Sequence, residues 1–119
     1  IKVLPDLNAN GRLTLGENLA DHGGLQVAYY ALKNATKTQA LPVIDGLTPE
    51  QRFFLAYAGV WAGNINEAEI RNRTKSDPHS LSRWRVNGAL PHIDMWYEAF
   101  GIKEGDKMFI PKSERLELW

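Results

Sequence analysis

The stretch from Thr14 to Ala31, TLGENLADHGGLQVAYYA, is where the fold and the chemistry of this chain are most clearly indicated. Its apolar residues recur with a helical period. Because Thr14 is followed three positions later by Glu17, as in a capping box, we expect a helix that begins near Leu15 and spans residues 15–33. Glu17 and Asp21 lie four positions apart and therefore share one face of that helix. Two neighbouring carboxylates repel each other, so we expect a metal ion or an arginine from elsewhere in the fold beside them.

Small residues fill the middle of the same stretch. Two of them, Gly23 and Gly24, are adjacent, and each glycine costs a helix interior roughly 1 kcal/mol relative to alanine. This pair predicts the close approach of another backbone.

Length and composition are those of one globular domain. A chain of 119 residues can bury roughly two-thirds of its unfolded surface, and no stretch approaches the roughly 20 apolar residues of a membrane span. Fourteen basic and 14 acidic residues give a net charge of zero, which argues against nucleic acid as a partner. The chain has no cysteine, which excludes disulfides and thiolate metal sites. Because it begins at Ile1 rather than methionine, we expect a processed or excised piece of a longer protein.

Three further helices are predicted. Thr48, Pro49 and Gln51 provide an N-cap, a first-turn proline and a capping-box partner, so we expect a deeply buried helix over residues 48–62. A polar helix with solvated charge pairs is expected over residues 66–75. A fourth, ended by Gly101, is expected over residues 92–100. We further expect apolar residues of the loop at 34–46 to dock on the core, and a short extended segment at 108–110. The predicted fold is mainly α, with about four helices and a short extended tail.

The string ENLADHGGL at residues 17–25 closely resembles the E-N-x-A-D-x-G-G-L segment of the neprilysin-like zinc metallopeptidases, the family of neprilysin and endothelin-converting enzyme. The resemblance implies that Glu17 is the third zinc ligand and that Asp21 is a carboxylate that braces the ligand shell. Both roles agree with zinc chemistry, because two His and one Glu leave a fourth position for water and outer carboxylates orient imidazole ligands.

Residues 77–88, DPHSLSRWRVNG, resemble the D-x-H-S-P-x-x-F-R-x-x-G segment of the same family, with Leu81 and Trp84 where Pro and Phe are common. The resemblance implies that His79 stabilises the oxyanion of the tetrahedral intermediate, that Asp77 orients His79, and that Arg85 hydrogen-bonds substrate carbonyl groups. A donor aimed at a developing oxyanion is typically worth about 10²- to 10³-fold in rate. By composition alone, His79 would be an ordinary surface histidine.

Residues 47–63, LTPEQRFFLAYAGVWAG, are similar to the family's helix that ends V-W-C-G. The resemblance implies that Val60 and Trp61 line the pocket for the substrate side chain after the scissile bond, and core packing is the alternative for both. The positions where animal members have cysteines carry other residues here, which implies a bacterial member. They are Ala62, Ile102 and Leu116, of which Leu116 lies three positions before Trp119.

The matching segments run from about Asn10 to Trp119. The resemblance therefore implies that residues 1–119 are the C-terminal part of a thermolysin-like (zincin) catalytic domain, whose H-E-x-x-H portion lies upstream. The parent would be a zinc metalloendopeptidase with zinc as cofactor. In this piece zinc would be absent or weakly bound, and the piece alone would be inactive. The implied site has three sets: catalytic His79, Asp77 and Asp21; substrate-binding Arg85, Val60 and Trp61; and the metal ligand Glu17.

The same resemblance implies peptide substrates and the remainder of the polypeptide as partners. Apolar surface left on the helices at 15–33 and 48–62, where the missing half would pack, predicts self-association. The expected location is the bacterial cell envelope or periplasm, with the cytoplasm as the alternative.

One alternative function stays open. The chain would then be a stand-alone helical module that keeps the peptidase scaffold, has lost its chemistry, and holds peptides in the cleft near Arg85 and Trp61. An upstream H-E-x-x-H would favour the enzyme. His22 and His92 lack the spacing of a helical metal pair, so we assign them no metal role. A purely structural bundle would leave Glu17, Asp21, His79 and Arg85 unexplained together.

Overall fold

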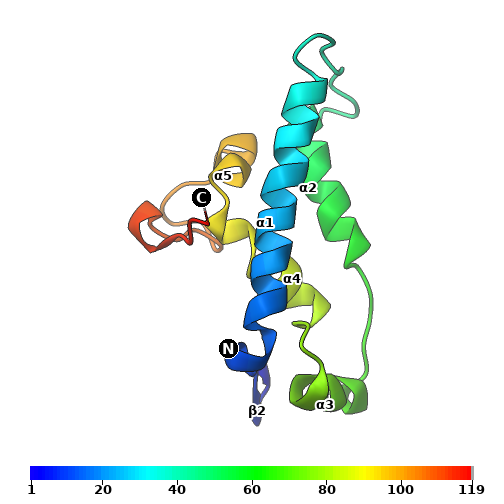
Figure 1. The fold of residues 1–119 in the computed structure, drawn as a ribbon, viewed down its shortest axis with the longest axis vertical. Coiled ribbons are helices and arrows are strands. Elements are labelled where there is room, and N and C mark those ends of the chain that lie inside the picture. The colour runs from blue at the N-terminus through cyan, green and yellow to red at the C-terminus, as the bar shows by residue number, and fades with distance from the viewer. Residues whose placement is uncertain (119) are drawn as a thin grey trace.

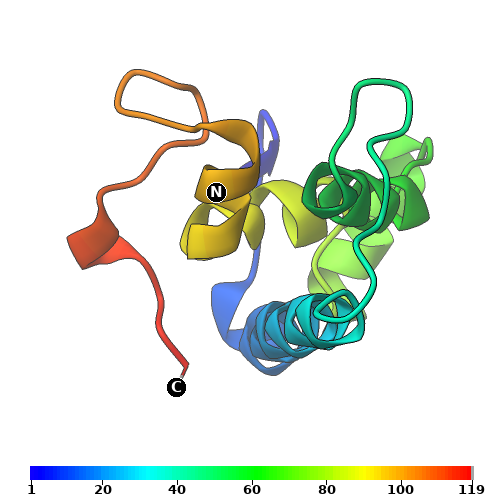
Figure 2. The ribbon, with the colours of Figure 1, turned by 90° about the horizontal axis from the view of Figure 1, so that it is seen from above.

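The computed structural model describes residues 1–118 (Figure 1). The chain starts with a small antiparallel hairpin of β1 (Lys2–Leu4) and β2 (Leu7–Asn8). The long helix α1 (Gly11–Ala35) then runs along the molecule, and a loop leads back to α2 (Pro49–Val60), which lies beside α1 (Figures 1 and 2). Trp119, at which the segments that resemble the peptidase family end, lies outside the described residues.

The second half of the chain is built from short helices. They are α3 (Glu67–Ser76), α4 (Ser82–Asn87), the single turn η1 (Leu90–His92), α5 (Asp94–Phe100) and the single turn η2 (Lys112–Glu114). Seen from above, α1, α2 and α5 surround a common centre, and the C-terminal tail passes outside α5 (Figure 2). The fold is therefore mainly α, as the sequence predicts.

The hydrophobic core lies where α1, α2 and α5 meet. The rings of Tyr29 from α1 and Phe54 from α2 stack with centroids 5.6 Å apart, and Ile93 at the start of α5 is fully buried. The other members of the cluster come from α1, η1 and α5: Leu25, Leu90, Trp96 and Tyr97. Burial of this kind yields about 25 cal/mol per Å² of apolar surface, so the core fixes the middle of α1 and leaves its first half to carry other groups.

The start of α1 differs from the prediction. α1 begins at Gly11, and the Asn10 side chain caps it by accepting a hydrogen bond from the Leu13 N–H at 3.2 Å. Thr14 is buried inside the first turns, where its hydroxyl donates to the Asn10 carbonyl oxygen at 3.3 Å. The predicted capping box of Thr14 with Glu17 is therefore wrong. Glu17 is left free to face another part of the chain.

The start of α2 confirms the prediction, but its environment does not. Thr48 and Gln51 form the capping box, with bonds of 3.1 Å and 3.0 Å between each side chain and the other residue's N–H. Deep burial of α2 is wrong, because Phe54 is its one buried residue in the described structure, whereas Leu55 and Val60 are 47% and 71% exposed. Apolar surface on the first two helices is thus exposed, as the sequence predicts.

The described residues contain five α-helices where about four were predicted. The additional one is α4, and the helix predicted over 92–100 is divided into η1 and α5. Gly101 ends α5 in the left-handed region with φ of 63°, as predicted. The charge pairs Glu67–Arg71 and Glu69–Arg73 lie on the exposed surface of α3, also as predicted.

The loops differ from the prediction in part. Met108 lies in a turn in which the Phe109 N–H donates to the Asp106 carbonyl oxygen at 3.0 Å, and residues 109–110 belong to no helix or strand. Leu41, Val43 and Ile44 are exposed rather than docked on the core. A Cβ added at Gly24 would meet no atom within 4 Å, so the close backbone approach predicted for the glycine pair is absent there within the described chain. None of the described helices has the length and apolar character that crossing a bilayer requires.

Candidate active site

The two carboxylates of α1 face in the predicted direction, but they meet different partners. Asp21 accepts two hydrogen bonds from Arg85 of α4, from Nε to Oδ2 and from Nη2 to Oδ1, each 2.6 Å long. Each of the two side chains is 15% exposed. A forked pair of this kind fixes the plane of the guanidinium as well as its distance. The arginine expected from elsewhere in the fold is therefore Arg85.

Arg85 is also held from α2. Its guanidinium carbon lies 3.8 Å from the centroid of the Trp61 ring, a cation–π contact, and its carbonyl oxygen accepts a 3.0 Å hydrogen bond from the Tyr57 hydroxyl. The hydrogen bonds that the Arg85 guanidinium donates to Asp21 raise its pKa, and burial followed by the charge of Asp21 raises the pKa of Tyr57. Both groups therefore keep their protons, and α1, α2 and α4 are joined at this point.

His79 lies between two carboxylates on the loop that precedes α4. Its Nδ1 lies 2.8 Å from Asp77 Oδ1, and its backbone N–H donates to the same oxygen at 2.9 Å. Its Nε2 lies 3.2 Å from Oε2 of Glu17 on α1. The backbone and side-chain hydrogen bonds from His79 lower the pKa of Asp77, so this carboxylate stays ionised and orients the ring.

Val60 lies at the end of α2 on the rim of a groove between α1 and α2. The groove has a volume of about 390 Å³, and small and apolar side chains predominate in its lining, among them Ala20, Gly24 and Ala28 of α1 and Ala56 of α2. Asp21 belongs to the same lining. The site thus combines an apolar groove with one fixed charge pair at its edge.

The residues of the described chain fit a metal ion only in part. Glu17 is 43% exposed and Asp21 is already paired with Arg85, so a single carboxylate is available as a ligand. In residues 1–118, no group of three or more His, Asp or Glu side chains is arranged to hold a metal. A tetrahedral zinc site with two imidazoles and one carboxylate would need its histidines from another part of the polypeptide.

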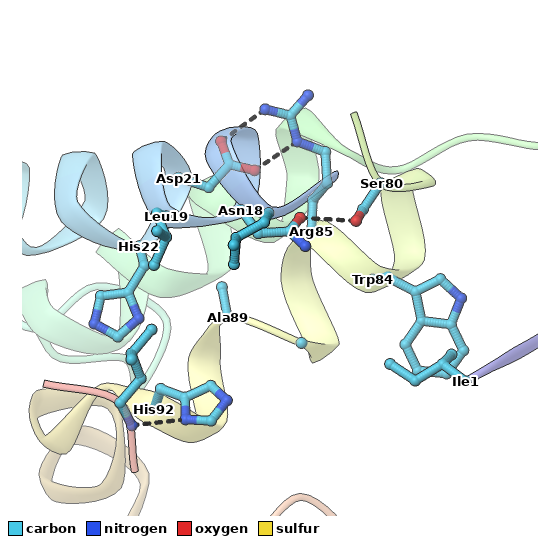
Figure 3. A pocket seen from close by; sticks show the side chains of 13 residues that line it. Ile1, Asn18, Leu19, Asp21, His22, Ser80, Trp84, Arg85, Ala89 and His92 are labelled. Atoms are coloured by element: carbon cyan, nitrogen blue, oxygen red, sulfur yellow. Dashed lines mark hydrogen bonds and ion pairs between the residues drawn. The ribbon is translucent and has the colours of Figure 1, made fainter. Parts of the chain in front are cut away.

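A second pocket has both Asp21 and Arg85 in its lining (Figure 3). It has a volume of about 210 Å³, and the rings of His22 and His92 lie at one end with centroids 6.2 Å apart. His22 is 2% exposed, and within the described residues its Nε2 has no hydrogen-bond partner. Burial lowers the pKa of both imidazoles, and that of His22 falls further because His92 is close. His92 Nδ1 accepts a 3.0 Å hydrogen bond from the Leu116 N–H.

Some residues of the site could not be identified by sequence reasoning. Tyr57, Asn18 and Ser80 contact the groups above or lie beside them, and the hydroxyl of Ser80 donates to Asn18 Oδ1 at 2.7 Å. Asn18 and Ser80 are letters of the two segments that resemble the peptidase family, and that was the one signal available for them. Nothing in the pattern around Tyr57 distinguished it from a core aromatic residue.

Comparison with known proteins gives the ancestry of this arrangement. The model of Peptidase family M13 matches residues 2–116. Neprilysin-3 of Drosophila melanogaster is 35% identical over 114 residues, endothelin-converting enzyme 1 of Mus musculus is 41% identical over 114, and membrane metallo-endopeptidase-like 1 of Homo sapiens is 40% identical over 116. These alignments cover 92–94% of this chain but 14% of each relative.

A solved structure agrees with the sequence relatives. The crystal structure of a Mycobacterium tuberculosis zinc metalloprotease in complex with an inhibitor superposes with a TM-score of 0.90 at 38% identity, covering 94% of this chain and 17% of that one. The similarity therefore extends over nearly all of the chain in both sequence and fold, and a bacterial protein is among the relatives. The chain belongs to Peptidase family M13, the neprilysin and endothelin-converting enzyme family.

Proposed function

We propose that this chain is the C-terminal part of the catalytic domain of a zinc metalloendopeptidase that hydrolyses oligopeptides. The observation that carries the proposal is the position of His79, whose Nε2 lies 3.2 Å from Glu17 while Asp77 holds Nδ1. An imidazole N–H beside a candidate metal ligand is suitably placed to donate to an oxygen that becomes negative during reaction. Since the chain spans 14% of its curated relatives, the activity belongs to a longer polypeptide.

Zinc is the cofactor that this proposal requires, held by Glu17 together with two histidines from the remainder of the polypeptide. When bound, it would supply a water molecule with a pKa lowered to about 7 and would polarise the peptide carbonyl. Asp21, fixed by Arg85, braces the helix face that presents Glu17. Losing a brace of this kind typically costs about 10- to 100-fold in metal affinity or activity.

The other groups act on the substrate. His79 donates to the oxyanion through Nε2, and because Asp77 holds Nδ1–H, the ring must carry both protons to do so. Arg85 donates hydrogen bonds from Nε and Nη2 to Asp21, so its remaining N–H groups are the donors for substrate carbonyl oxygens. Val60 and Trp61 would contact the side chain that follows the scissile bond.

The chain alone should be inactive. It contributes one metal ligand and the oxyanion donor, and its described residues contain no group of three or more side chains arranged to hold a metal ion. We propose that the remainder of the polypeptide packs against the groove between α1 and α2 and that the isolated chain associates with itself through the same surface.

The test compares the full-length polypeptide with the 119-residue chain in zinc content and in cleavage of a fluorogenic peptide. We expect the full-length protein to bind about one zinc and to cleave, and the 119-residue chain and full-length Glu17→Gln to do neither. Glu69→Gln on exposed α3 is the matched control and should keep both. If the full-length protein binds no zinc and cleaves nothing, the peptidase proposal fails and peptide binding becomes the function to measure.

A further inference from the structure

The loop that carries His79 is tied to α1 by a short chain of hydrogen bonds. The Ser80 hydroxyl donates to Asn18 Oδ1 at 2.7 Å, and the Asn18 amide donates to Thr14 Oγ1 at 3.3 Å. The Thr14 hydroxyl in turn donates to the carbonyl oxygen of Asn10, the residue that caps α1, at 3.3 Å. Figure 3 shows the bond between Ser80 and Asn18. Ser80 directly follows His79 and Asn18 directly follows Glu17, so this bond joins the two residues next to the candidate oxyanion donor and the candidate metal ligand.

Packing does little to hold this loop. A cavity of about 100 Å³ lies beneath it, lined by Thr14, Asn18, His79, Ser80 and apolar residues of β1 and α4. Side chains that border a cavity lack contact atoms on that side and are free to shift. The His79 side chain itself is 43% exposed. Its position relative to α1 must therefore come from specific bonds.

The other bonds of His79 do not supply that position. Those to Asp77 lie within the loop and fix the ring relative to the loop, not relative to α1. The contact with Glu17 would have to yield when Glu17 binds a metal. In the described residues, the bond from Ser80 to Asn18 is the remaining hydrogen bond between this loop and α1.

We infer that Ser80 and Asn18 are positioning residues, which hold the His79 imidazole at its distance from Glu17 through the hydrogen bond between them. This inference rests on the proposed role of His79 and adds two residues to which no role has been given. It predicts an effect on the step in which charge develops rather than on substrate binding, because His79 meets the oxyanion only in the transition state.

The test uses the full-length polypeptide and the variant Ser80→Ala. One neutral hydrogen bond is typically worth enough to change a rate by about 3- to 10-fold, so kcat should fall by that factor while KM stays within about twofold. Ser80→Thr, which keeps the hydroxyl, should restore kcat. Ser113→Ala in the exposed tail is the matched control and should change neither value.

A double variant decides whether Ser80 acts through His79. In a His79→Ala background, adding Ser80→Ala should cause no further loss, because the group that it positions is gone. The inference would be overturned if the losses in kcat of the two single variants multiplied in the double variant. A raised KM with unchanged kcat in Ser80→Ala, or no effect of Ser80→Ala, would also overturn it.

A second measurement keeps the inference testable if the proposed peptidase activity fails. Amide hydrogen exchange over residues 77–81 should be about 3- to 10-fold faster in Ser80→Ala than in the wild type, and unchanged in Ser113→Ala. Faster exchange in a protein without peptidase activity would support the tether and reject only the catalytic role of His79. Unchanged exchange would reject the tether itself.

Discussion

At the scale of single residues, the pair of Asp21 and Arg85 is the most firmly held contact of the site. Ion pairs at a protein surface contribute about 0–1 kcal/mol, because water screens the charges and the long side chains lose freedom. This pair is only 15% exposed on each side, forms two 2.6 Å bonds and is stacked on Trp61. Removing one partner would leave the other charge partly buried without compensation.

We therefore expect Arg85→Ala to lower the free energy of unfolding of the 119-residue chain by about 1–3 kcal/mol. Arg73→Ala is the control, because Arg73 pairs with Glu69 on exposed α3, at 49% and 40% exposure, and should cost less than about 1 kcal/mol. Urea unfolding followed by circular dichroism measures both. Equal losses in the two variants would show that the buried pair has no special weight.

His22 gives the chain a pH dependence at the same scale. Burial, followed by the nearby His92, lowers the folded-state pKa of His22 below its usual value of 6.5, so the unfolded state binds a proton first as the pH falls. The free energy of unfolding should thus be constant above about pH 7 and decrease towards pH 5, by up to about 1.4 kcal/mol per pH unit.

His22→Leu, which keeps the volume without the titrating group, should flatten this dependence. Urea unfolding at about pH 8, 6 and 5 tests it, above the range in which most carboxyl groups titrate. His79→Leu is a matched control with an exposed histidine. A slope in His22→Leu as steep as in the wild type would mean that other groups, such as His92, cause it.

At the scale of elements, local signals predicted what local forces decide. Thr48, Pro49 and Gln51 are sufficient to start α2, and Gly101 is sufficient to end α5. α4 has six residues and no side-chain cap, so nothing in its own sequence marks it. Its place depends on Arg85 and other contacts with residues far away in the chain.

The site divides in the same way. Helical spacing placed Glu17 and Asp21 on one face, and the neighbouring Asp77 and His79 contact each other as the family resemblance implies. The pairing of Asp21 with Arg85 spans 64 positions, and no periodicity encodes a contact of that range. The predicted start of α1 was wrong because Asn10 and Thr14 are both good N-cap residues. The burial of Thr14, which is a property of the tertiary structure, decides between them.

That assignment of the cap can be tested. Asn10→Ala should lower the free energy of unfolding by about 1 kcal/mol, because the Leu13 N–H loses its acceptor. Asn10→Asp keeps an oxygen in place and should be within about 0.5 kcal/mol of the wild type. Thermal unfolding followed by circular dichroism is the measurement. If Asn10→Ala has no effect, α1 does not depend on this cap.

At the scale of the whole molecule, several large apolar side chains of α1 and α2 are exposed. Leu15, Val27 and Tyr30 on α1 are 57%, 58% and 52% exposed, and Val60 on α2 is 71% exposed. The groove between the two helices adds about 390 Å³ of mostly apolar space. A contiguous apolar patch on a folded protein usually marks a place where another surface packs, and the groove, with Val60 on its rim, is the candidate for such a patch here.

We propose that two copies of the isolated chain meet at this groove, because no other part of the polypeptide is there to cover it. Sedimentation of the 119-residue chain at tens of micromolar should then show association that increases with concentration. Ala28→Lys puts a charge into the groove and should weaken the association at least about tenfold, since a lysine would lose its hydration there. Asn34→Lys adds the same charge to α1 outside the groove lining and should leave the association unchanged.

If the two variants weaken association equally, the contact lies elsewhere or the weakening is a general effect of charge. If Ala28→Lys destabilises the full-length polypeptide and Asn34→Lys does not, the remainder of the polypeptide occupies the groove.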